Sequence, residues 1–372
     1  MKLPSCYIHI PFCIRKCRYC SFFSIEKTGC DIPSYIQALL NEEIHEDKTQ
    51  YSSIYIGGGT PTCLSPAELA VLLEGIERIA DINTTEEYTI EGNPGTLDNE
   101  KLEILLEYGV NRISIGCQSF NNSILTFLGR IHSAEESRQA VDRAHDKGFS
   151  NISVDIMYGI PGQTADEVKH DILEACKLKP EHISCYQLSA ELETPLYKDI
   201  KKGKYSLPDE EMVCRMDITI CGILEKNNYE RYEISNFAQK GYESLHNIHY
   251  WQGGEYAGFG AGAVSRLGRQ REKRVEDIDL YMASGKDSPE RLEYSENVSG
   301  SLKERELLMT GLRMIRGISN AHFLEHTGNS LSKYKHTFER LDRGGYVKYS
   351  EEHVKLTQKG LPVLNEILVE LF

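Results

Sequence analysis

The sequence lacks any apolar run that approaches the roughly 20 residues of a membrane-spanning helix. Its N-terminal stretch, MKLPSCYIHI, also lacks the basic segment followed by an apolar one that marks a secretory signal peptide. Because both features are missing, we expect a cytoplasmic protein without membrane spans.

An excess of positive charge is also missing. The 372 residues carry 42 Lys and Arg against 56 Asp and Glu, a formal net charge of −14. A surface that binds nucleic acid needs a basic stripe, so no nucleic acid is expected among the partners. The local basic cluster at 266–274 is more typical of a solvated charged loop.

Disulfide chemistry is not expected, although cysteine is frequent. The chain has 11 cysteines, an odd number, and a chain without an export signal keeps its thiols reduced. Eight of them are scattered, and a free cysteine in apolar surroundings behaves as a small hydrophobic residue. We expect these eight to be buried structural thiols: Cys6, Cys30, Cys63, Cys117, Cys176, Cys185, Cys214 and Cys221.

The other three cysteines lie together in HIPFCIRKCRYCSFFS, residues 9–24. Cys13, Cys17 and Cys20 have the spacing C-x3-C-x2-C, and no fourth cysteine follows nearby. Structural zinc sites use four protein ligands, and His9 could supply the fourth, although it lies on an expected strand. Three cysteines on a four-iron cluster leave one iron open to a small molecule, so the spacing favours an iron–sulfur cluster. Basic and aromatic neighbours would balance its charge and exclude water: Arg15, Lys16, Arg18, Phe12, Tyr19, Phe22 and Phe23.

The first half of the chain alternates between short runs typical of buried strands and longer segments with helical periodicity. Six strand–helix units in sequence predict a parallel sheet covered by helices. Six units are too few for a closed eight-stranded barrel, so we expect an α/β fold built as an open, partial (β/α)6 barrel. The strands are expected at residues 6–10, 53–58, 87–93, 112–118, 152–159 and 182–189.

The intervening helices carry recognisable start and stop signals. In SPAELAVLLEGIERI, Ser65 takes the N-cap position, Pro66 opens the first turn and Glu68 stands three residues after the cap, which is the pattern of a capping box. Two other segments close on a glycine. The helical segments are 32–46, 65–79, 97–109, 133–148 and 164–177.

Polar and glycine-rich segments follow the expected strands where each strand ends. GGGTPT follows the second strand, EGNPGT the third and Gln118-Ser119-Phe120 the fourth, while the fifth carries Asp155 and ends in YGIPGQT. The carboxyl ends of parallel strands meet at one rim of a barrel. Because the cysteine segment also follows a strand, the first one, we expect a single ligand site at this rim.

Together these motifs resemble those of the radical S-adenosylmethionine (SAM) superfamily. The cysteine spacing, GGGTP and the partial barrel carry the resemblance to the superfamily as a whole. YIHIPFC, GGGTPT, EGNP, RISIGCQSF, GRIH and DIMYGIPGQT resemble one branch of it, which contains the oxygen-independent coproporphyrinogen III oxidases and the HemW heme chaperones. These motifs occur in order across nearly the whole chain.

The resemblance implies a 4Fe-4S cluster held by Cys13, Cys17 and Cys20, with its open iron meeting the amino and carboxylate groups of SAM. In the active enzymes of the superfamily, an electron from the cluster cleaves SAM to methionine and a 5′-deoxyadenosyl radical. Backbone groups of a glycine-rich strand end would meet the methionyl ammonium, and the carboxylates and arginine would meet the ribose and carboxylate of SAM. The residues implied to bind SAM are Tyr7, Gly58, Gly59, Thr60, Glu91, Gln118, Arg130 and Asp155.

The alternation stops after residue 190. A helix is expected near 208–227, and an added strand with its turn near 229–237. The glycines that follow indicate a loop with tight bends: Gly253, Gly254, Gly258, Gly260 and Gly262.

The segment HNIHYW, residues 246–251, contains the single tryptophan of the chain. From chemistry alone, its two histidines could bind a metal or heme, but a polar turn packed onto the barrel is the simpler interpretation. The resemblance favours heme, because H-N-x-x-Y-W is similar to a signature of the HemW branch. It implies His246 as the heme ligand and His249 as a variable position. The implied heme-binding set is His246, Asn247, Tyr250 and Trp251.

The C-terminal segment resembles a winged-helix module, with helices followed by the hairpin YVKYSEEHVKLT and a last helix. It lacks a dominant basic face, so we interpret it as a packing or partner domain. The expected domains are 1–200, the partial barrel with the 4Fe-4S and SAM sites; 201–298, an α+β extension with HNxxYW; and 299–372, the winged-helix-like domain.

The coproporphyrinogen oxidases differ from this sequence at the cysteine motif. They continue it with another cysteine two residues on, where this chain has Phe22, and they carry a long extension ahead of the first strand. The leading hypothesis is therefore a heme chaperone that delivers heme, its cargo, to apo-hemoproteins such as respiratory cytochromes or oxidases. A porphyrinogen-decarboxylating enzyme and a winged-helix regulator that senses redox state remain alternatives. The resemblance also allows peripheral membrane association and a homodimer bridged at the open iron.

Overall fold

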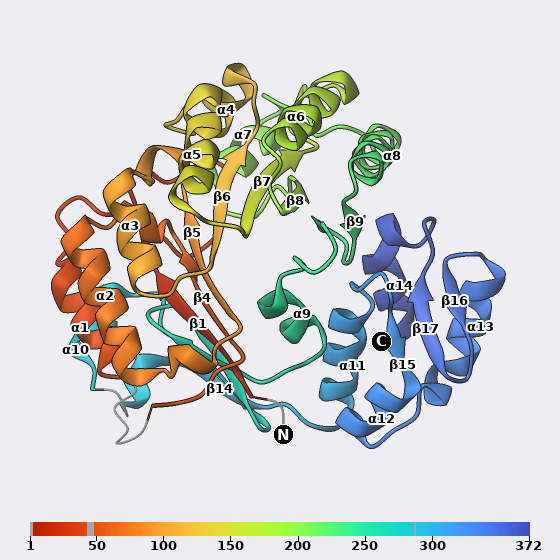
Figure 1. The fold of residues 1–372 in the computed structure, drawn as a ribbon. Coiled ribbons are helices and arrows are strands. Elements are labelled where there is room, and N and C mark those ends of the chain that lie inside the picture. The colour runs from red at the N-terminus through yellow and green to blue at the C-terminus, as the bar shows by residue number, and fades with distance from the viewer. Residues whose placement is uncertain (1–2, 43–47, 286–287) are drawn as a thin grey trace.

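The computed structural model describes residues 3–42, 48–285 and 288–372. The six predicted strands form and lie side by side, all parallel. Their side chains alternate, so that apolar residues such as Ile54 and Ile56 face the surrounding helices and polar ones face the barrel interior. The fold is an open α/β barrel of the predicted class (Figure 1). The strands are β1 (Ser5–Ile10), β4 (Ser53–Gly58), β5 (Glu87–Gly92), β6 (Arg112–Gln118), β7 (Ile152–Tyr158) and β8 (His182–Gln187).

Helices cover the outer face of this sheet (Figure 1). The helix expected over 32–46 ends at Leu40 and gives way to a turn at Asn41 and Glu42, and residues 43–47 lie outside the described residues. The helix expected near 208–227 is confirmed. The helices of this part are α1 (Ile32–Leu40), α2 (Pro66–Ile79), α3 (Asn99–Glu107), α4 (Asn122–Leu128), α5 (Ala134–Lys147), α6 (Ala165–Lys177), α7 (Pro195–Lys201) and α8 (Glu210–Lys226).

The predicted capping box of α2 is present. The Glu68 backbone N–H donates to Ser65 Oγ at 3.3 Å, and the Ser65 backbone N–H donates to Glu68 Oε2 at 2.7 Å. Replacing Ser65 with Ala should lower the free energy of unfolding by about 1 kcal/mol, because the helix loses a cap. Urea unfolding followed by circular dichroism measures the change. Val71→Ala, at an exposed position of the same helix, is the control and should stay within about 0.5 kcal/mol of the parent; equal losses in both variants would contradict the capping role.

The sheet continues beyond the six strands at both edges, and this corrects two expectations. The glycine-rich segment 253–262 is not only a loop, because it contains β11 (Tyr256–Phe259), which pairs parallel with β1. The basic segment 266–274 lies largely in a hairpin rather than in a solvated loop, and its Arg271 pairs with Glu296 and Glu306. The added strands are β9 (Glu230–Arg231), β10 (Asn236–Ala238), β11, β12 (Val264–Leu267), β13 (Gln270–Arg274) and β14 (Leu292–Asn297).

The C-terminal segment has the element order expected for a winged-helix-like fold, with a short extra strand before its second helix. Its three strands pair in the order β15-β17-β16, and it has a hydrophobic cluster of its own. The domain boundaries at residues 200 and 298 stay a prediction. The elements are α11 (Gly300–Gly311), β15 (Ile318–Ser319), α12 (Asn320–Thr327), α13 (Lys335–Arg343), β16 (Val347–Tyr349), β17 (His353–Leu356) and α14 (Leu364–Leu371), preceded by α10 (Ile278–Ala283).

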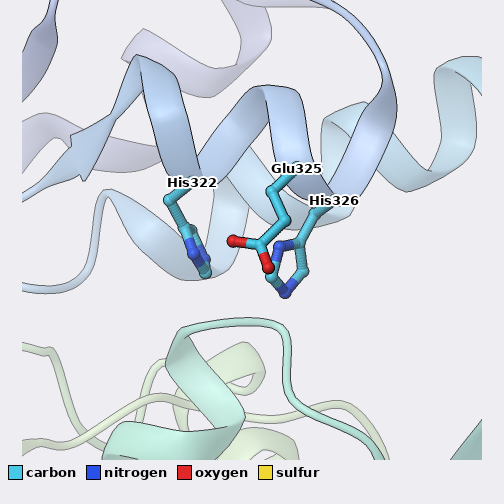
Figure 2. Close-up of side chains that lie close together, drawn as sticks. All are labelled: His322, Glu325 and His326. Atoms are coloured by element: carbon cyan, nitrogen blue, oxygen red, sulfur yellow. The ribbon is translucent and has the colours of Figure 1, made fainter. Parts of the chain in front are cut away.

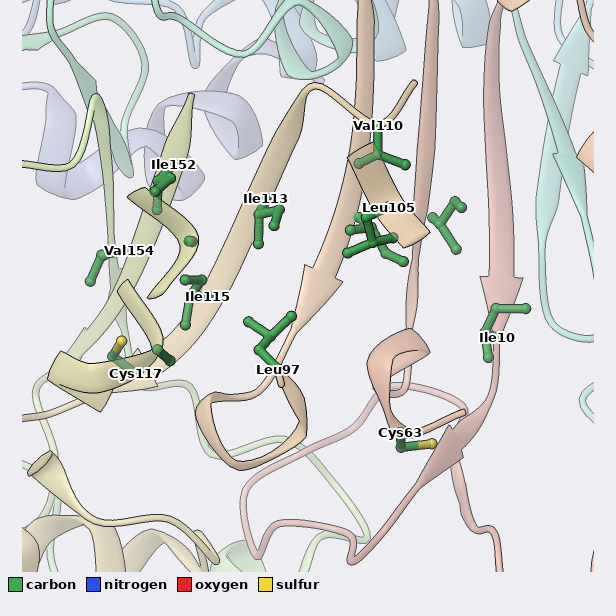
Figure 3. Close-up of a cluster of buried hydrophobic side chains, with 14 of the residues drawn as sticks. Ile10, Cys63, Leu97, Leu105, Val110, Ile113, Ile115, Cys117, Ile152 and Val154 are labelled. Carbon is green, nitrogen blue, oxygen red and sulfur yellow. The ribbon is translucent and has the colours of Figure 1, made fainter. Parts of the chain in front are cut away.

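The main core lies between the barrel sheet and its helices. Figure 3 shows isoleucine side chains from the strands packed near Leu105 of α3 and the loop residue Leu97. All eleven cysteines are free, but the expectation that the eight scattered ones are buried holds only in part. Four are buried, whereas Cys30, which lies in a loop, and Cys176, Cys214 and Cys221, which lie on helices, are partly exposed. Within the described ranges, no helix has the length and apolar character to span a membrane.

Candidate functional site

A cavity of about 370 Å³ opens at the carboxyl ends of the barrel strands. The rim predicted from the sequence therefore does enclose a space. Of the eleven residues expected at the cluster and SAM sites, only Tyr7 is absent from its lining. The ten that line it are Cys13, Cys17, Cys20, Gly58, Gly59, Thr60, Glu91, Gln118, Arg130 and Asp155.

The three cysteine thiols reach the cavity from one loop. Cys13 ends β2 (Phe12–Cys13), which pairs with β3 (Ile25–Glu26) and so closes the loop on itself. Cys13 Sγ shares a hydrogen bond with Thr60 Oγ1 at 3.6 Å, and Arg130 Nη1 donates to Cys17 Sγ at 3.4 Å. Burial raises the pKa of the Cys13 and Cys20 thiols. Thiolates at these positions therefore need cationic compensation, which a metal cluster supplies.

The basic residues of the cysteine loop do not all face the thiols. Arg15 donates to the Gly129 carbonyl, Lys16 donates to the Phe22 and Ser24 carbonyls, and Arg18 forms an ion pair with Asp199. The cation that contacts a cysteine is Arg130 instead. Two further hydrogen bonds hold the Arg130 guanidinium in place, because it also donates to the Asn93 side chain and to the Gly116 carbonyl.

His9 does not complete a four-ligand zinc set with the cysteines. Its Nδ1 pairs with the Tyr7 hydroxyl at 3.0 Å, and its Nε2 donates to the Phe23 carbonyl at 2.8 Å. Both ring nitrogens are therefore engaged inside the barrel. Since His9 is not available as a fourth ligand, the three thiols fit an iron–sulfur cluster better than structural zinc.

The glycine-rich end of β4 comes close to neighbouring backbone and rings. Gly58 has φ +110°, and a Cβ there would lie 2.5 Å from the His9 ring. A Cβ at Gly59 would lie 2.6 Å from the Phe12 carbonyl oxygen. Only glycine fits these two positions, so the strand end presents bare backbone to the cavity.

Glu91 and Asp155 are two of the three carboxylates that line the same cavity, together with Glu191. The Tyr55 hydroxyl donates to Glu91 Oε1 at 2.7 Å, and the Gly58 backbone N–H donates to Glu91 Oε2 at 3.2 Å. Burial raises the pKa of the Glu91 carboxyl to about 7, although these hydrogen bonds oppose the change. Asp155 accepts from Ser114 Oγ at 3.1 Å, and burial raises its pKa as well. Within the described ranges neither carboxylate forms an ion pair, although Arg112 acts on both from a distance, and both suit a ligand rich in donors.

Gln118 takes an unusual backbone conformation at the end of β6. Its φ is +67°, in the left-handed region that non-glycine residues rarely adopt, and the pairing of β6 with β7 shifts register there. The kink turns the Gln118 side chain into the cavity.

Tyr7 lies deeper in the barrel than expected. Its ring stacks on Tyr55 with centroids 6.2 Å apart, and its hydroxyl meets His9. Sequence reasoning missed Tyr55, which joins Tyr7 to Glu91. The alternation of β4 could have revealed it, because Ser53, Tyr55 and Gly57 share the inward face.

The HNIHYW segment forms a helix, α9 (Leu245–Trp251), and not the polar turn considered above. Three donors at its start, Ser244 Oγ and the backbone N–H groups of Leu245 and His246, bind the Glu87 carboxylate at 3.1, 2.8 and 3.1 Å. Glu87 begins β5, so α9 docks at the amino ends of the strands. The helix therefore lies at the opposite end of the barrel from the cysteine cavity.

His246 points into the barrel. Its Nδ1 pairs with Ser53 Oγ at 3.0 Å, and its ring packs on Tyr55 with centroids 5.0 Å apart. Burial lowers the pKa of the His246 imidazole to about 3, and His249 and Arg112 act in the same direction. The imidazole is therefore neutral at physiological pH.

The other HNxxYW residues lie along α9. The Asn247 backbone N–H donates to Ser244 Oγ at 3.4 Å, within the cap of the helix. Tyr250 is 38% exposed and contacts the rings of Trp251 and Tyr256. Trp251 Nε1 is buried without a hydrogen bond among the described residues, and the Arg313 guanidinium lies 4.5 Å from its ring centroid. Helix α9 thus sits between the barrel and the C-terminal domain.

Comparison with known proteins extends these observations to the whole chain. Residues 7–175 match the family described as Radical SAM superfamily, and 303–363 match the HemN C-terminal domain. Heme chaperone HemW of Bacillus subtilis (strain 168) is 37% identical over 98% of this chain and 98% of its own length. Heme chaperone HemW of Escherichia coli (strain K12) is 33% identical over 100% and 99%. The structure of coproporphyrinogen III oxidase (HemN) from Escherichia coli superposes with a TM-score of 0.84 over 100% of this chain and 90% of that one; at 21% identity, this shows a shared fold.

Proposed function

The chain belongs to the radical SAM superfamily and to its HemN-like branch, and from this premise we propose that it is a heme chaperone that delivers heme to apo-hemoproteins of the respiratory chain. The observation that carries the proposal is full-length similarity to relatives named heme chaperone HemW, combined with an HNxxYW helix docked to the barrel. The proposal includes a cytoplasmic location. It also includes peripheral association with the membrane, because respiratory acceptors are found there, and a homodimer.

We assign a 4Fe-4S cluster to Cys13, Cys17 and Cys20. The thiols converge on one cavity, and Arg130 supplies a positive charge next to Cys17. The cluster, when bound, supplies an electron and an open iron for SAM. The loop itself keeps the cluster's surroundings apolar with Tyr19 and Phe22, which both line the cavity.

The cavity residues of the strand ends form the proposed SAM site. Gly58, Gly59 and Thr60 offer backbone groups at close range, while the Glu91 and Asp155 carboxylates accept hydrogen bonds from ligand donors. Gln118 adds an amide and Arg130 a cation. Tyr7 contributes to the site indirectly. Its ring stacks on Tyr55, and the Tyr55 hydroxyl donates to Glu91.

The heme site is proposed at α9, with His246, Asn247, Tyr250 and Trp251. Six-residue strands at about 3.3 Å per residue span roughly 20 Å. SAM and heme would therefore approach the barrel from opposite ends. For an iron atom to reach His246, the ring must turn away from Ser53 or present its other nitrogen.

A radical SAM enzyme that acts on a porphyrinogen is the second candidate. The observation in its favour is the cavity. Three thiols line it together with carboxylates that can accept hydrogen bonds from SAM. Phe22, where the oxidases carry another cysteine, is 69% exposed at the cavity and offers no ligand there.

Protein loaded anaerobically with its cluster should bind heme in an absorbance titration, and His246→Ala should weaken binding at least about 10-fold, since losing a ligand costs no less than losing an outer hydrogen-bond partner. Coproporphyrinogen III supplied with SAM and a reductant in a parallel assay should give no protoporphyrinogen. Porphyrinogen conversion without specific heme binding would replace the chaperone proposal with the oxidase.

Two further variants separate a ligand from a structural role of His246. Ser53→Ala removes the partner of Nδ1 but leaves the imidazole, so it should keep the absorbance spectrum of histidine-ligated heme. His336→Ala changes an exposed histidine of α13 and should bind heme like the parent protein. A His246→Ala variant with the heme spectrum and affinity of the parent would exclude His246 as the ligand.

A further inference from the structure

Helix α12 carries three metal-ligating side chains that the sequence reasoning did not single out. In HFLEH, His322, Glu325 and His326 stand at positions i, i+3 and i+4, which share one helix face. One potential ligand atom from each lies within 4.8 Å of the others. Figure 2 shows the Glu325 carboxylate between the two imidazole rings, with all three side chains pointing away from α12 toward a neighbouring segment.

That segment is the end of α9. His322 Nε2 donates to the Gln252 carbonyl at 2.9 Å, one residue after Trp251. A Cβ at Gly253 would lie 4.0 Å from His326 Cδ2. The three side chains therefore gather at the contact between the C-terminal domain and the HNxxYW helix.

The hydrogen bond of His322 prepares it as a metal ligand. Because the partner is a carbonyl oxygen, Nε2 carries the proton, and Nδ1 is the ring nitrogen left for a metal. Metal-bound histidines commonly donate their other nitrogen to a backbone carbonyl in this way, which fixes the ring. The two rings lie with centroids 4.2 Å apart.

His326 is held in the form that binds metals. Its Nδ1 is buried and makes no hydrogen bond of normal geometry. A buried ring nitrogen without a hydrogen-bond partner is available to coordinate a cation.

We propose that His322, Glu325 and His326 bind a zinc ion. Two imidazoles and one carboxylate are a ligand set that suits zinc, and three protein ligands leave a fourth position open. Because His322 also donates to the Gln252 carbonyl, zinc bound to this ring would link the C-terminal domain to the end of the HNxxYW helix. The site needs neither heme nor SAM, so it stands apart from the proposed function.

Positive charge near the site lowers its affinity for zinc. Lys303 and Arg266 lie on this side, and both line a small cavity with His326 and Glu306. Glu306 lies 4.0 Å from Arg266 and pairs with Arg271, so it offsets part of this charge. Lys303 shares this cavity with His326, so Lys303→Met, which removes a positive charge near the proposed zinc ion, should tighten zinc binding.

Equilibrium dialysis of the cluster-loaded, full-length protein against zinc tests the proposal. Cluster loading keeps zinc away from the cysteine loop, and iron analysis verifies it. One zinc per chain is expected beyond the iron. His322→Ala and His326→Ala should each weaken binding more than about 100-fold, and Glu325→Gln about 10-fold, since ligand losses exceed the effects of outer hydrogen-bond partners.

His336→Ala is the matched control, because it removes an exposed histidine from the same domain. Glu325 is exposed, so its variant should fold normally. A second readout is the fluorescence of Trp251, the single tryptophan. Nickel bound at this site should quench that fluorescence in His336→Ala but not in His326→Ala. Equal zinc binding in the parent, His322→Ala and His326→Ala would overturn the proposal, and so would the absence of zinc from the parent.

Discussion

Cys17→Ala protein, purified and reconstituted without oxygen, should contain no iron–sulfur cluster. Three thiols from one loop are the ligands that the cavity offers, and two thiols leave half of a four-iron cluster without protein ligands. Cys17 is also the thiol that Arg130 contacts, so its loss removes the pairing that balances charge there. Iron and sulfide analysis and the visible absorbance of the reconstituted protein measure the result.

Cys30→Ala is the control for this experiment. Cys30 comes ten residues after the loop, and its thiol donates to the Glu26 carbonyl at 3.4 Å instead of lining the cavity. The control should take up iron like the parent protein. Full iron content in Cys17→Ala, or equal losses in both variants, would contradict the assignment of the cluster to Cys13, Cys17 and Cys20.

Glu91→Gln should lower the affinity for SAM by about 10–100-fold, because a hydrogen bond to a charged group contributes about 1.5–3 kcal/mol. The carboxylate has one oxygen on the Tyr55 hydroxyl and one on the Gly58 N–H, and it lines the cavity beside both. An amide keeps the shape but replaces one acceptor with a donor. Anaerobic calorimetry with cluster-loaded protein measures the affinity, and unchanged iron content shows that the cluster is intact.

The pH dependence identifies Glu91 as the group responsible. With a pKa of about 7, the carboxyl is mostly protonated at pH 6 and ionised at pH 8. SAM affinity of the parent should therefore rise across this interval, and Glu91→Gln should lose that rise. Glu86→Gln, an exposed change one residue before the same strand, is the control. A parent affinity that is flat with pH would show that the ionised carboxylate is not the form that binds.

Burial of Glu91 also affects the stability of the ligand-free protein. Because the pKa is raised in the folded state, the folded chain binds more protons than the unfolded one between about pH 4.5 and 7. This contribution to stability is present at low pH and is lost as the pH rises through 7. Asp155, whose pKa is also raised, acts in the same direction.

Local patterns predicted the barrel well because its strands and helix caps depend on neighbouring residues. The run SIYIGG at 53–58 forms β4 with those bounds, and Ser65 caps α2 as expected. The position of the cavity followed from a topological rule, since carboxyl ends of parallel strands share one rim. Glu91, near the end of its strand, and Asp155, on the inward face of β7, therefore line the cavity.

Other features depend on contacts between distant parts of the chain. The segment YAGF has no strand pattern of its own, and it becomes β11 because β1 offers an edge and Gly258 lets Val264 approach closely. The docking of α9 requires Glu87 and Ser53 to meet residues more than 150 positions later. The resemblance implies Tyr7 as a SAM-binding residue, and in the structure it lies beside the cavity lining, with its ring on Tyr55 and its hydroxyl on His9.

The contact of His246 with Tyr55 has a thermodynamic consequence. Tyr55 links the two mouths of the barrel. At one mouth its ring packs on His246 of α9, and its hydroxyl donates to Glu91, which accepts the Gly58 N–H at the other mouth. A ligand that turns His246 changes the packing of Tyr55 and so the acceptor strength of Glu91. Binding at the two mouths is then reciprocal, because each ligand must change the affinity of the other by the same factor. Heme that loosens Tyr55 would lower the affinity for SAM. By the same coupling, SAM that holds Tyr55 in place would lower the affinity for heme.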